Sequence, residues 1–273
     1  MIVQSALQDQ PHFIITMAEH SLLAGQFARA FGNTRFESVS PLSEMLYLID
    51  HHDQGWFDLD ISPRVNPKTG LPWHLSNTPN RLKMMTMMKS VHFNQMHHCY
   101  CGLLAAMHMW GIYHGRYGLS GNALIDTIPK KYKDEFNQEF ILLAKKKTWL
   151  ETQLAKDPTT QNWLRRYLWQ NYKQLQFFDS LALYFNCTGE TMRLPASFVQ
   201  VPLSAIQTQT IKIEPIENNQ YLLTPFPFKQ PKVSISFQGR YLLPEQRDTD
   251  QLHQALLYAP LQRQQVQLVG TCL

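Results

Sequence analysis

The chain has 273 residues, 44% of them hydrophobic, and a formal net charge of +4. This length allows a sizeable core, in one large domain or in a main domain with a smaller appendage. No stretch reaches the roughly 18 uninterrupted apolar residues that a membrane span requires, and the first residues lack the basic and apolar regions of a secretory signal. We therefore expect a cytoplasmic protein with no membrane partner.

The charge pattern and the cysteines exclude two further classes of protein. The lysine clusters at 130–133 and 145–147 are flanked by acidic residues, which is typical of a solvated helix face rather than a nucleic acid interface. The 4 cysteines are too few for a disulfide scaffold, and we expect them to be reduced. The 11 histidines stand out, because histidine is a common metal ligand and titrates near neutrality.

Apolar residues recur at helical spacing along most of the first 190 residues. The expected helices span residues 19–31, 41–52, 79–92, 98–110, 129–156 and 157–187, with a long loop rich in proline, glycine and aromatic residues at 53–73. After about residue 195 the apolar residues alternate with period two, as in strands, around one more helix at 248–258. The sequence thus predicts a mainly α protein, with a helical bundle over residues 1–192 and a small strand-rich α+β appendage over residues 193–273.

Two histidines and two aspartates lie on the buried faces of the expected helices or directly after them. His20 and His52 continue the apolar faces of the first two helices, and Asp53 follows where the second helix ends. Asp179 lies within the apolar stretch 177–185, with no lysine or arginine within one turn. A buried carboxylate is costly unless it is paired or bound to a metal, and divalent transition metals accept imidazole and carboxylate ligands. We expect these four side chains to form a metal site, although each alone also fits a hydrogen-bonded core residue.

Two further residues are candidates for the same site. His108 ends a buried helix face that contains Leu104 and Ala105, so it is a candidate extra ligand that decides between one ion and two. The alternative is a core histidine bonded to a backbone carbonyl. Arg116, in the turn at 114–118, is a candidate anion clamp because a guanidinium binds phosphate through two parallel hydrogen bonds. An ordinary surface arginine fits that turn equally well.

Aromatic residues in and beyond the 53–73 loop are candidates for the wall of a pocket. These residues are Trp56, Phe57, Trp73, Trp110 and Tyr113. Packing in the core is the more usual role of such side chains.

The order of the candidate ligands resembles the H…HD…D pattern of the HD-domain metal-dependent phosphohydrolases. His20 supplies the first histidine, His52 and Asp53 the dipeptide, and Asp179 the final aspartate. More narrowly, the chain resembles an uncharacterised bacterial family that we place within this HD-like superfamily, over about residues 1–190. The segments that carry this narrower resemblance are 20–25, 52–56, 60–63, 69–72 and 115–118. The resemblance implies a helical domain with one or two divalent transition metal ions, which can be Mn, Fe, Zn, Ni or Co.

These features together predict a reaction and a class of substrate, but no particular compound. We expect a metal-dependent phosphohydrolase in which Asp53 and Arg116 serve catalysis, Asp53 as a ligand and Arg116 as a phosphate clamp. The expected substrate is a small anionic molecule, either a nucleotide or another phosphorylated metabolite. Two alternatives stay open, an HD-like di-iron oxygenase and a non-catalytic sensor module that binds a metal or a ligand. Association of identical chains also stays open.

Overall fold

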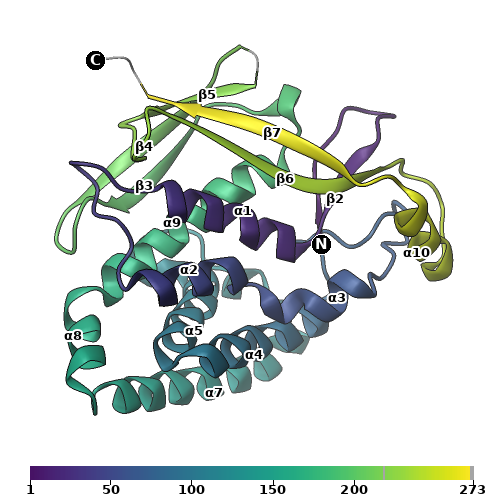
Figure 1. Cartoon of the computed structure of the whole chain (residues 1–273). Coiled ribbons are helices and arrows are strands. Elements are labelled where there is room, and N and C mark those ends of the chain that lie inside the picture. Colours follow the sequence, from purple (N-terminus) through teal and green to yellow (C-terminus); the bar gives the residue numbers. More distant parts are fainter. Residues whose placement is uncertain (218, 271–273) are drawn as a thin grey trace.

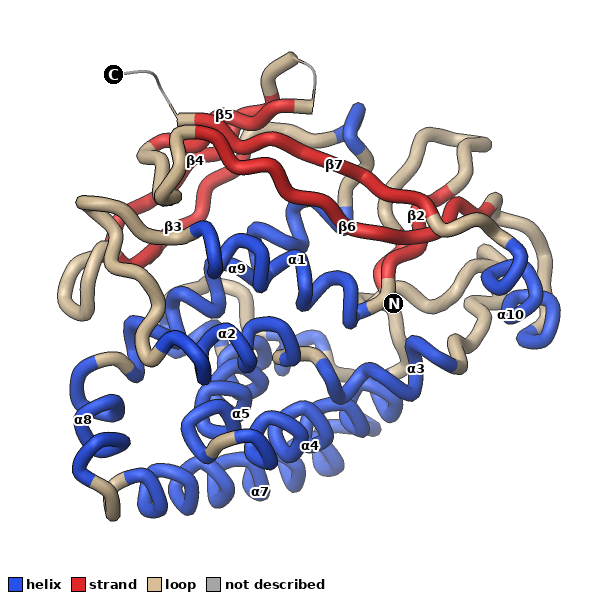
Figure 2. The backbone as a smooth tube through the Cα atoms, viewed as in Figure 1, coloured by secondary structure: helices blue, strands red, loops and turns tan. Residues whose placement is uncertain are grey.

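A curled seven-stranded sheet covers one side of a layer of helices (Figures 1 and 2). This computed structural model describes residues 1–217 and 219–270. The strand order is β1-β2-β6-β7-β5-β4-β3, and neighbouring strands are antiparallel except for the parallel pair β5 and β7. The strands are β1 (Ile2–Val3), β2 (His12–Ile15), β3 (Ala196–Pro202), β4 (Thr208–Pro215), β5 (Gln220–Thr224), β6 (Lys232–Leu242) and β7 (Gln262–Val269).

The helices begin close to the residues that the sequence predicts, and several have side-chain caps at their first turn. Thr16 accepts a hydrogen bond from the Glu19 N–H at the start of α1, and Asp157 caps α8 just before Pro158. The helix expected at 157–187 is split at Tyr167 into two helices. The helices are α1 (Met17–Ala30), α2 (Leu42–His51), α3 (Phe57–Ile61), α4 (Asn80–His97), α5 (Cys99–Tyr113), α6 (Gly115–Gly118), α7 (Lys130–Leu154), α8 (Pro158–Arg166), α9 (Leu168–Cys187) and α10 (Thr249–Tyr258), with single turns η1 (Gln54–Trp56), η2 (Leu124–Thr127) and η3 (Glu190–Met192).

The prediction of a mainly α protein with a small strand-rich appendage is wrong, because strands from both ends of the chain form one large sheet. β2 pairs with β6, so that Phe13 lies opposite Tyr241. β1 and β2 are too short for period-two alternation to be recognised in the sequence. The fold is therefore α+β. The predicted boundary between residues 1–192 and 193–273 stays a prediction.

Helices α1 and α9 lie between the sheet and the remaining helices (Figure 1). α1 packs against β6 and α9 packs against β3, while both helices also contact each other. Buried aromatic rings fill this interface: the ring centroids of Phe31 and Phe178 are 5.1 Å apart, and those of Phe27 and Phe185 are 6.1 Å apart. Each such ring contributes about 1.5–3 kcal/mol when fully buried. This packing fixes the register of α1 against α9.

Two expectations from composition concern membrane spans and the state of the cysteines. None of the described helices is long and apolar enough to cross a membrane. Cys99, Cys101 and Cys187 carry free thiols. Cys272 lies outside the described residues.

His74 joins the 53–78 region to β1 through a partly buried hydrogen bond, and this bond makes the stability of the fold depend on pH. Its Nδ1 accepts a hydrogen bond from the Val3 N–H at 3.0 Å, which requires an unprotonated nitrogen. Burial, followed by the positive charges of the Met1 amine and Lys83, lowers the pKa of His74 to about 4. The unfolded chain therefore takes up this proton first, so the contribution of His74 to stability is present above its ordinary pKa of 6.5 and is lost as the pH falls toward 4.

We expect wild type to lose stability relative to His74→Gln as the pH is lowered, because glutamine can accept the same hydrogen bond without titrating. Denaturant unfolding at about pH 7.5 and about pH 4.5, near the two ends of the titration, measures the free energy of unfolding of both proteins. A difference in unfolding free energy that does not change with pH would contradict the assignment.

Candidate metal centre

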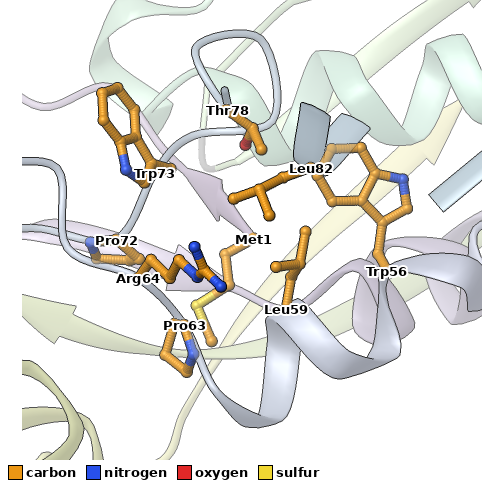
Figure 3. A pocket seen from close by; sticks show the side chains of 9 residues that line it. All are labelled: Met1, Trp56, Leu59, Pro63, Arg64, Pro72, Trp73, Thr78 and Leu82. Atoms are coloured by element: carbon orange, nitrogen blue, oxygen red, sulfur yellow. The ribbon is translucent and has the colours of Figure 1, made fainter. Parts of the chain in front are cut away.

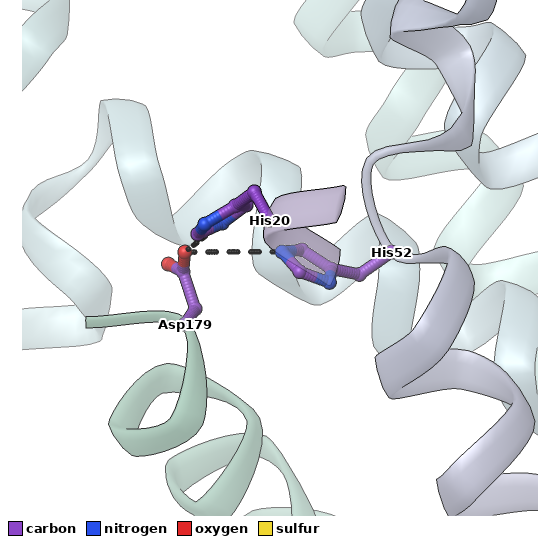
Figure 4. A group of neighbouring side chains, drawn as sticks. All are labelled: His20, His52 and Asp179. Atoms are coloured by element: carbon purple, nitrogen blue, oxygen red, sulfur yellow. Dashed lines mark hydrogen bonds and ion pairs between the residues drawn. The ribbon is translucent and has the colours of Figure 1, made fainter. Parts of the chain in front are cut away.

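Three helices bring His20, His52 and Asp179 to one point (Figure 4). His20 comes from α1, His52 directly follows α2, and Asp179 comes from α9. The Oδ1 atom of Asp179 lies 3.1 Å from Nε2 of His20 and 3.8 Å from Nε2 of His52. Asp53 approaches the same atoms, with its Oδ2 at 3.5 Å from Nε2 of His52 and 3.9 Å from Nε2 of His20. The four residues that the sequence predicts to converge are therefore brought together.

The hydrogen bond of His52 sets which ring nitrogen is free. Its Nδ1 lies 2.8 Å from the carbonyl oxygen of Ile49. A carbonyl oxygen only accepts, so Nδ1 carries the proton and Nε2 of the neutral ring keeps its lone pair. This Nε2 is buried and has no hydrogen-bond partner among the described residues. A backbone carbonyl on the far nitrogen is the usual support of a metal-binding histidine.

His20 is held in the same way from α9. Its Nδ1 lies 3.0 Å from the amide oxygen Oδ1 of Asn186, which accepts the Nδ1 proton. Its Nε2 is thereby directed at the carboxylate of Asp179. Two imidazole nitrogens and two carboxylates thus surround one position, a donor set that suits divalent transition metals.

The electrostatics of the cluster require a positive charge beside the carboxylates. Burial alone would raise the pKa of Asp179, but the hydrogen bond from His20 and the close approach of the His52 imidazole hold it well below its usual range. Burial would lower the pKa of His52, but the charges of Asp53 and Asp179 raise it to about 9. Either a proton on the imidazoles or a divalent cation can supply this charge, and the residues present fit the cation.

His108 lies beside the cluster, with its ring centroid 5.3 Å from that of His52. Its potential ligand atom groups with those of His52 and Asp53 within 4.8 Å. Its partner is not a backbone carbonyl: the amide nitrogen of Gln176 lies 2.6 Å from its Nδ1. Because this nitrogen donates, Nδ1 is the acceptor and Nε2 carries the proton of the neutral ring. Burial lowers the pKa of His108 to about 4, so the ring is neutral at pH 7.

The amide of Gln176 therefore decides the role of His108. With the nitrogen toward the ring, His108 offers an N–H and no lone pair to the cluster. Turning the amide would place its oxygen on Nδ1 and free Nε2 for a metal ion; that oxygen is buried and has no partner among the described residues. The observed orientation favours one ion, and a ligand role for His108 stays a prediction.

Arg116 lies in a left-handed turn of unusual length. The residues of α6 have φ angles of 60° at Gly115, 50° at Arg116, 57° at Tyr117 and 84° at Gly118. Glycine adopts this conformation freely, whereas a residue with a side chain loses about 1–2 kcal/mol. Strain of this kind is concentrated at functional sites. Arg116 forms no ion pair with the residues that the structure describes, so it is not a structural link between charged groups.

A cavity of about 480 Å³ joins Arg116 to the cluster. Its wall includes His20, Asp53, His108 and Asp179, together with a mostly apolar surface that includes Met87. This volume lies within the range of small-molecule sites. The sequence analysis missed Lys83, Asn80 and Asn122, which also line this cavity. Asn80 and Lys83 lie in the first turn of α4 and Asn122 in a loop, where polar residues are ordinary and carry no signal of a site.

The aromatic residues predicted to form a pocket wall lie in different places, and only some of them line the large cavity. Trp56 and Tyr113 line the large cavity. Trp73 lies instead on a separate pocket of about 10 Å³ near Met1, also lined by Trp56 and Arg64 (Figure 3). That space is about the size of one water molecule, too small for a ligand. Trp110 stacks on His114, with ring centroids 4.1 Å apart, and Phe57 is exposed.

The sequence analysis also missed the two amides that orient the histidines. Gln176 precedes Asp179 by three residues and Asn186 follows it by seven, so all three lie on one face of α9. Both amides are buried. Polar residues repeating at helical spacing in an otherwise apolar helix were the signal that could have revealed them.

The fold and the cluster define an α+β protein with a buried histidine and aspartate centre that can hold a metal. A family model described as "Protein of unknown function (DUF3891)" matches residues 1–244, and the chain belongs to this family. The matched region contains every residue of the cluster and ends just after β6. Comparisons with curated proteins and with solved structures gave no significant match.

We expect Asp179→Ala to abolish metal binding and to lower Tm, because the remaining ligands cannot close the site. A metal that binds only the folded state adds about 2.7 kcal/mol of stability at roughly 100 times its dissociation constant. Elemental analysis and thermal melts with and without chelator measure both effects, with the exposed Asp134→Ala as control. Chelator should lower the Tm of the control and not of Asp179→Ala. Unchanged metal content and Tm in Asp179→Ala would show that this aspartate is an ordinary core residue.

The orientation of the Gln176 amide predicts the number of ions. We expect one ion per chain both in wild type and in His108→Ala, since His108 contributes a proton and not a lone pair. Metal stoichiometry after loading with excess Mn or Co measures this. Two ions in wild type and one in the variant would show that the amide is turned and that His108 is a ligand.

Proposed function

We propose that this protein is a metal-dependent phosphohydrolase acting on a small phosphorylated metabolite or nucleotide. The observation that carries the proposal is the convergence of His20, His52 and Asp179 beside a cavity that is also lined by Arg116, which forms no ion pair with the described residues. The resemblance to the H…HD…D pattern supports the same conclusion. The free thiols of the described cysteines support a reducing compartment, so we include a cytoplasmic location in the proposal.

His20, His52, Asp53 and Asp179 would hold the metal. When bound, a divalent ion supplies Lewis acidity, lowers the pKa of water toward neutrality and stabilises negative charge that develops on a phosphoryl oxygen. The carbonyl of Ile49 and the amide of Asn186 keep the two imidazoles in the required orientation. These supports allow the ligands to stay in place without reorganising during a reaction.

Arg116 would bind the phosphoryl group of the substrate. Its guanidinium has no carboxylate partner among the described residues, so its full charge is available to an anion. Two parallel N–H donors match two phosphate oxygens and orient the group. The strained turn at 115–118 restricts where the side chain begins, which limits the entropy lost on binding.

His108 and the apolar wall would complete the site. His108 lines the cavity as a neutral imidazole with its proton on Nε2, and so can donate a hydrogen bond to an oxygen of the substrate. Side chains such as Met109 and Ile112 bury the rest of the substrate and exclude water. A drier site strengthens each electrostatic contact within it.

The second group of ligand atoms favours an HD-like di-iron oxygenase as the second candidate. His52, Asp53 and His108 bring three such atoms within 4.8 Å of one another, and the carboxylate of Asp53 would bridge two ions, since the one free nitrogen of His52 binds a single ion. This chemistry needs the turned amide of Gln176. Two redox-active iron ions in the purified protein, detected by their electronic spectra, would favour the oxygenase over the hydrolase.

We expect hydrolysis of phosphorylated compounds to depend on added Mn, Co, Ni or Mg ions and to fall in Arg116→Ala. Loss of a charged hydrogen bond costs about 1.5–3 kcal/mol, or about 10- to 100-fold in kcat/KM. The exposed Arg263→Ala is the control, and metal content should be the same in all three proteins. A fully loaded wild-type protein with no turnover on any phosphorylated compound would contradict the proposal and leave the oxygenase or a non-catalytic sensor.

A further inference from the structure

A second cavity of about 270 Å³ adjoins the first and is formed by other elements. Arg116 and Ser120 line both cavities, Leu119 beside them lines the second, and the rest of the second wall comes from α9 and β3. The wall includes Lys173, Gln176 and Ser180 from α9 and Ser197 and Gln200 from β3. The volume suits a ligand smaller than a typical drug-sized molecule.

The charge of this second cavity is entirely positive. Lys173 and Arg116 contribute cations, and none of the residues that form its wall is a carboxylate. The only hydrogen bond of the Lys173 amine within the described part of the chain is a long one, 3.5 Å to the amide oxygen of Gln200. Two cations without a counter-charge attract a doubly charged anion more strongly than a singly charged one.

Two polar groups near these cations lack hydrogen-bond partners among the described residues. The hydroxyl of Ser180 and the amide oxygen of Gln176 are buried without a partner in the described chain, and Gln176 is only 5% exposed. A serine in a helix usually donates to a carbonyl one turn earlier, which Ser180 does not do. A buried unpaired group costs about 1–3 kcal/mol, so a ligand that brings hydroxyl groups to this wall relieves part of that cost.

The backbone on both sides of the cavity is strained. Arg116 has φ 50° on one wall and Gln200 has φ 60° on the other, although neither residue is glycine. Gln200 lies in a β-bulge, where the register of β3 against β4 shifts between Phe198 and Val201. Bulges of this kind redirect side chains and are common beside binding sites.

From these observations we propose that the second cavity binds a small hydroxylated organic phosphate, with Lys173 and Arg116 on the phosphate and the serine hydroxyls and Gln176 on the hydroxyl groups. Lys173 belongs to this site alone, whereas Arg116 is shared with the proposed active site. Occupation of the second site therefore competes for the guanidinium that the first site uses. Gln176 gives a second connection, since its amide nitrogen bonds His108.

The test uses the full chain after removal of metal by chelator and dialysis, so that the histidine and aspartate cluster offers no cation to phosphate. Glycerol 3-phosphate is titrated into the protein by calorimetry, with inorganic phosphate and glycerol as separate probes. We expect saturable binding of one glycerol 3-phosphate per chain, tighter than inorganic phosphate, and no binding of glycerol. Lys173→Gln should weaken binding about tenfold or more, while Lys68→Gln, at an exposed position that is not part of this wall, leaves it unchanged.

A second variant tests whether the ligand occupies the cavity itself, in case Lys173→Gln weakens binding indirectly. Ser197 is exposed on β3, so Ser197→Trp fills the cavity from its rim without disturbing the core, and should abolish binding at unchanged Tm. No saturable binding in wild type, or equal binding in wild type and both variants, overturns the proposal. Binding that is lost only in Asp179→Ala also overturns it, because the anion would then sit at the cluster. The result is independent of hydrolysis, so failure of the proposed activity would leave this site standing.

Discussion

The burial of the Asp179 carboxylate between two imidazoles is the constraint on which the rest of the molecule depends. Removing this charge from water costs several kcal/mol unless cations or hydrogen bonds compensate for it. His20 and His52 supply those contacts at 3.1 and 3.8 Å. Because the three residues come from α1, α2 and α9, the cluster requires an exact placement of three helices. The sheet provides part of that placement, since β6 packs on α1 and β3 packs on α9.

The sequence predicts the members of the cluster because the relevant information is local. Each of His20, His52 and Asp179 interrupts an apolar helix face, and a buried polar group needs a partner. Their order along the chain, with its resemblance to the H…HD…D pattern, indicates that they are partners of one another. The orientation of an amide is not local information. Gln176 therefore decides the tautomer of His108 in a way that no spacing rule predicts.

The sheet is the part of the fold that the sequence could not give. β1 and β2 span two and four residues, too few for an alternating pattern to be distinguished from chance. The second partner of β2, strand β6, lies more than 200 residues away, and pairing at that separation has no local signature. The turn at 115–118 could be predicted only in part. Its two glycines predict a turn, but the left-handed conformation of Arg116 and Tyr117 follows only from the surrounding structure.

The central claim is that the space between the two imidazoles and the two carboxylates belongs to a metal ion. A crystal structure of the protein grown with excess Mn or Zn, with anomalous data collected at the absorption edge of that metal, tests it most directly. The account predicts an anomalous peak at about 2.0–2.2 Å from Nε2 of His20, from Nε2 of His52 and from a carboxylate oxygen of Asp179. An absent peak, with Asp179 hydrogen-bonded directly to the imidazoles, would contradict it.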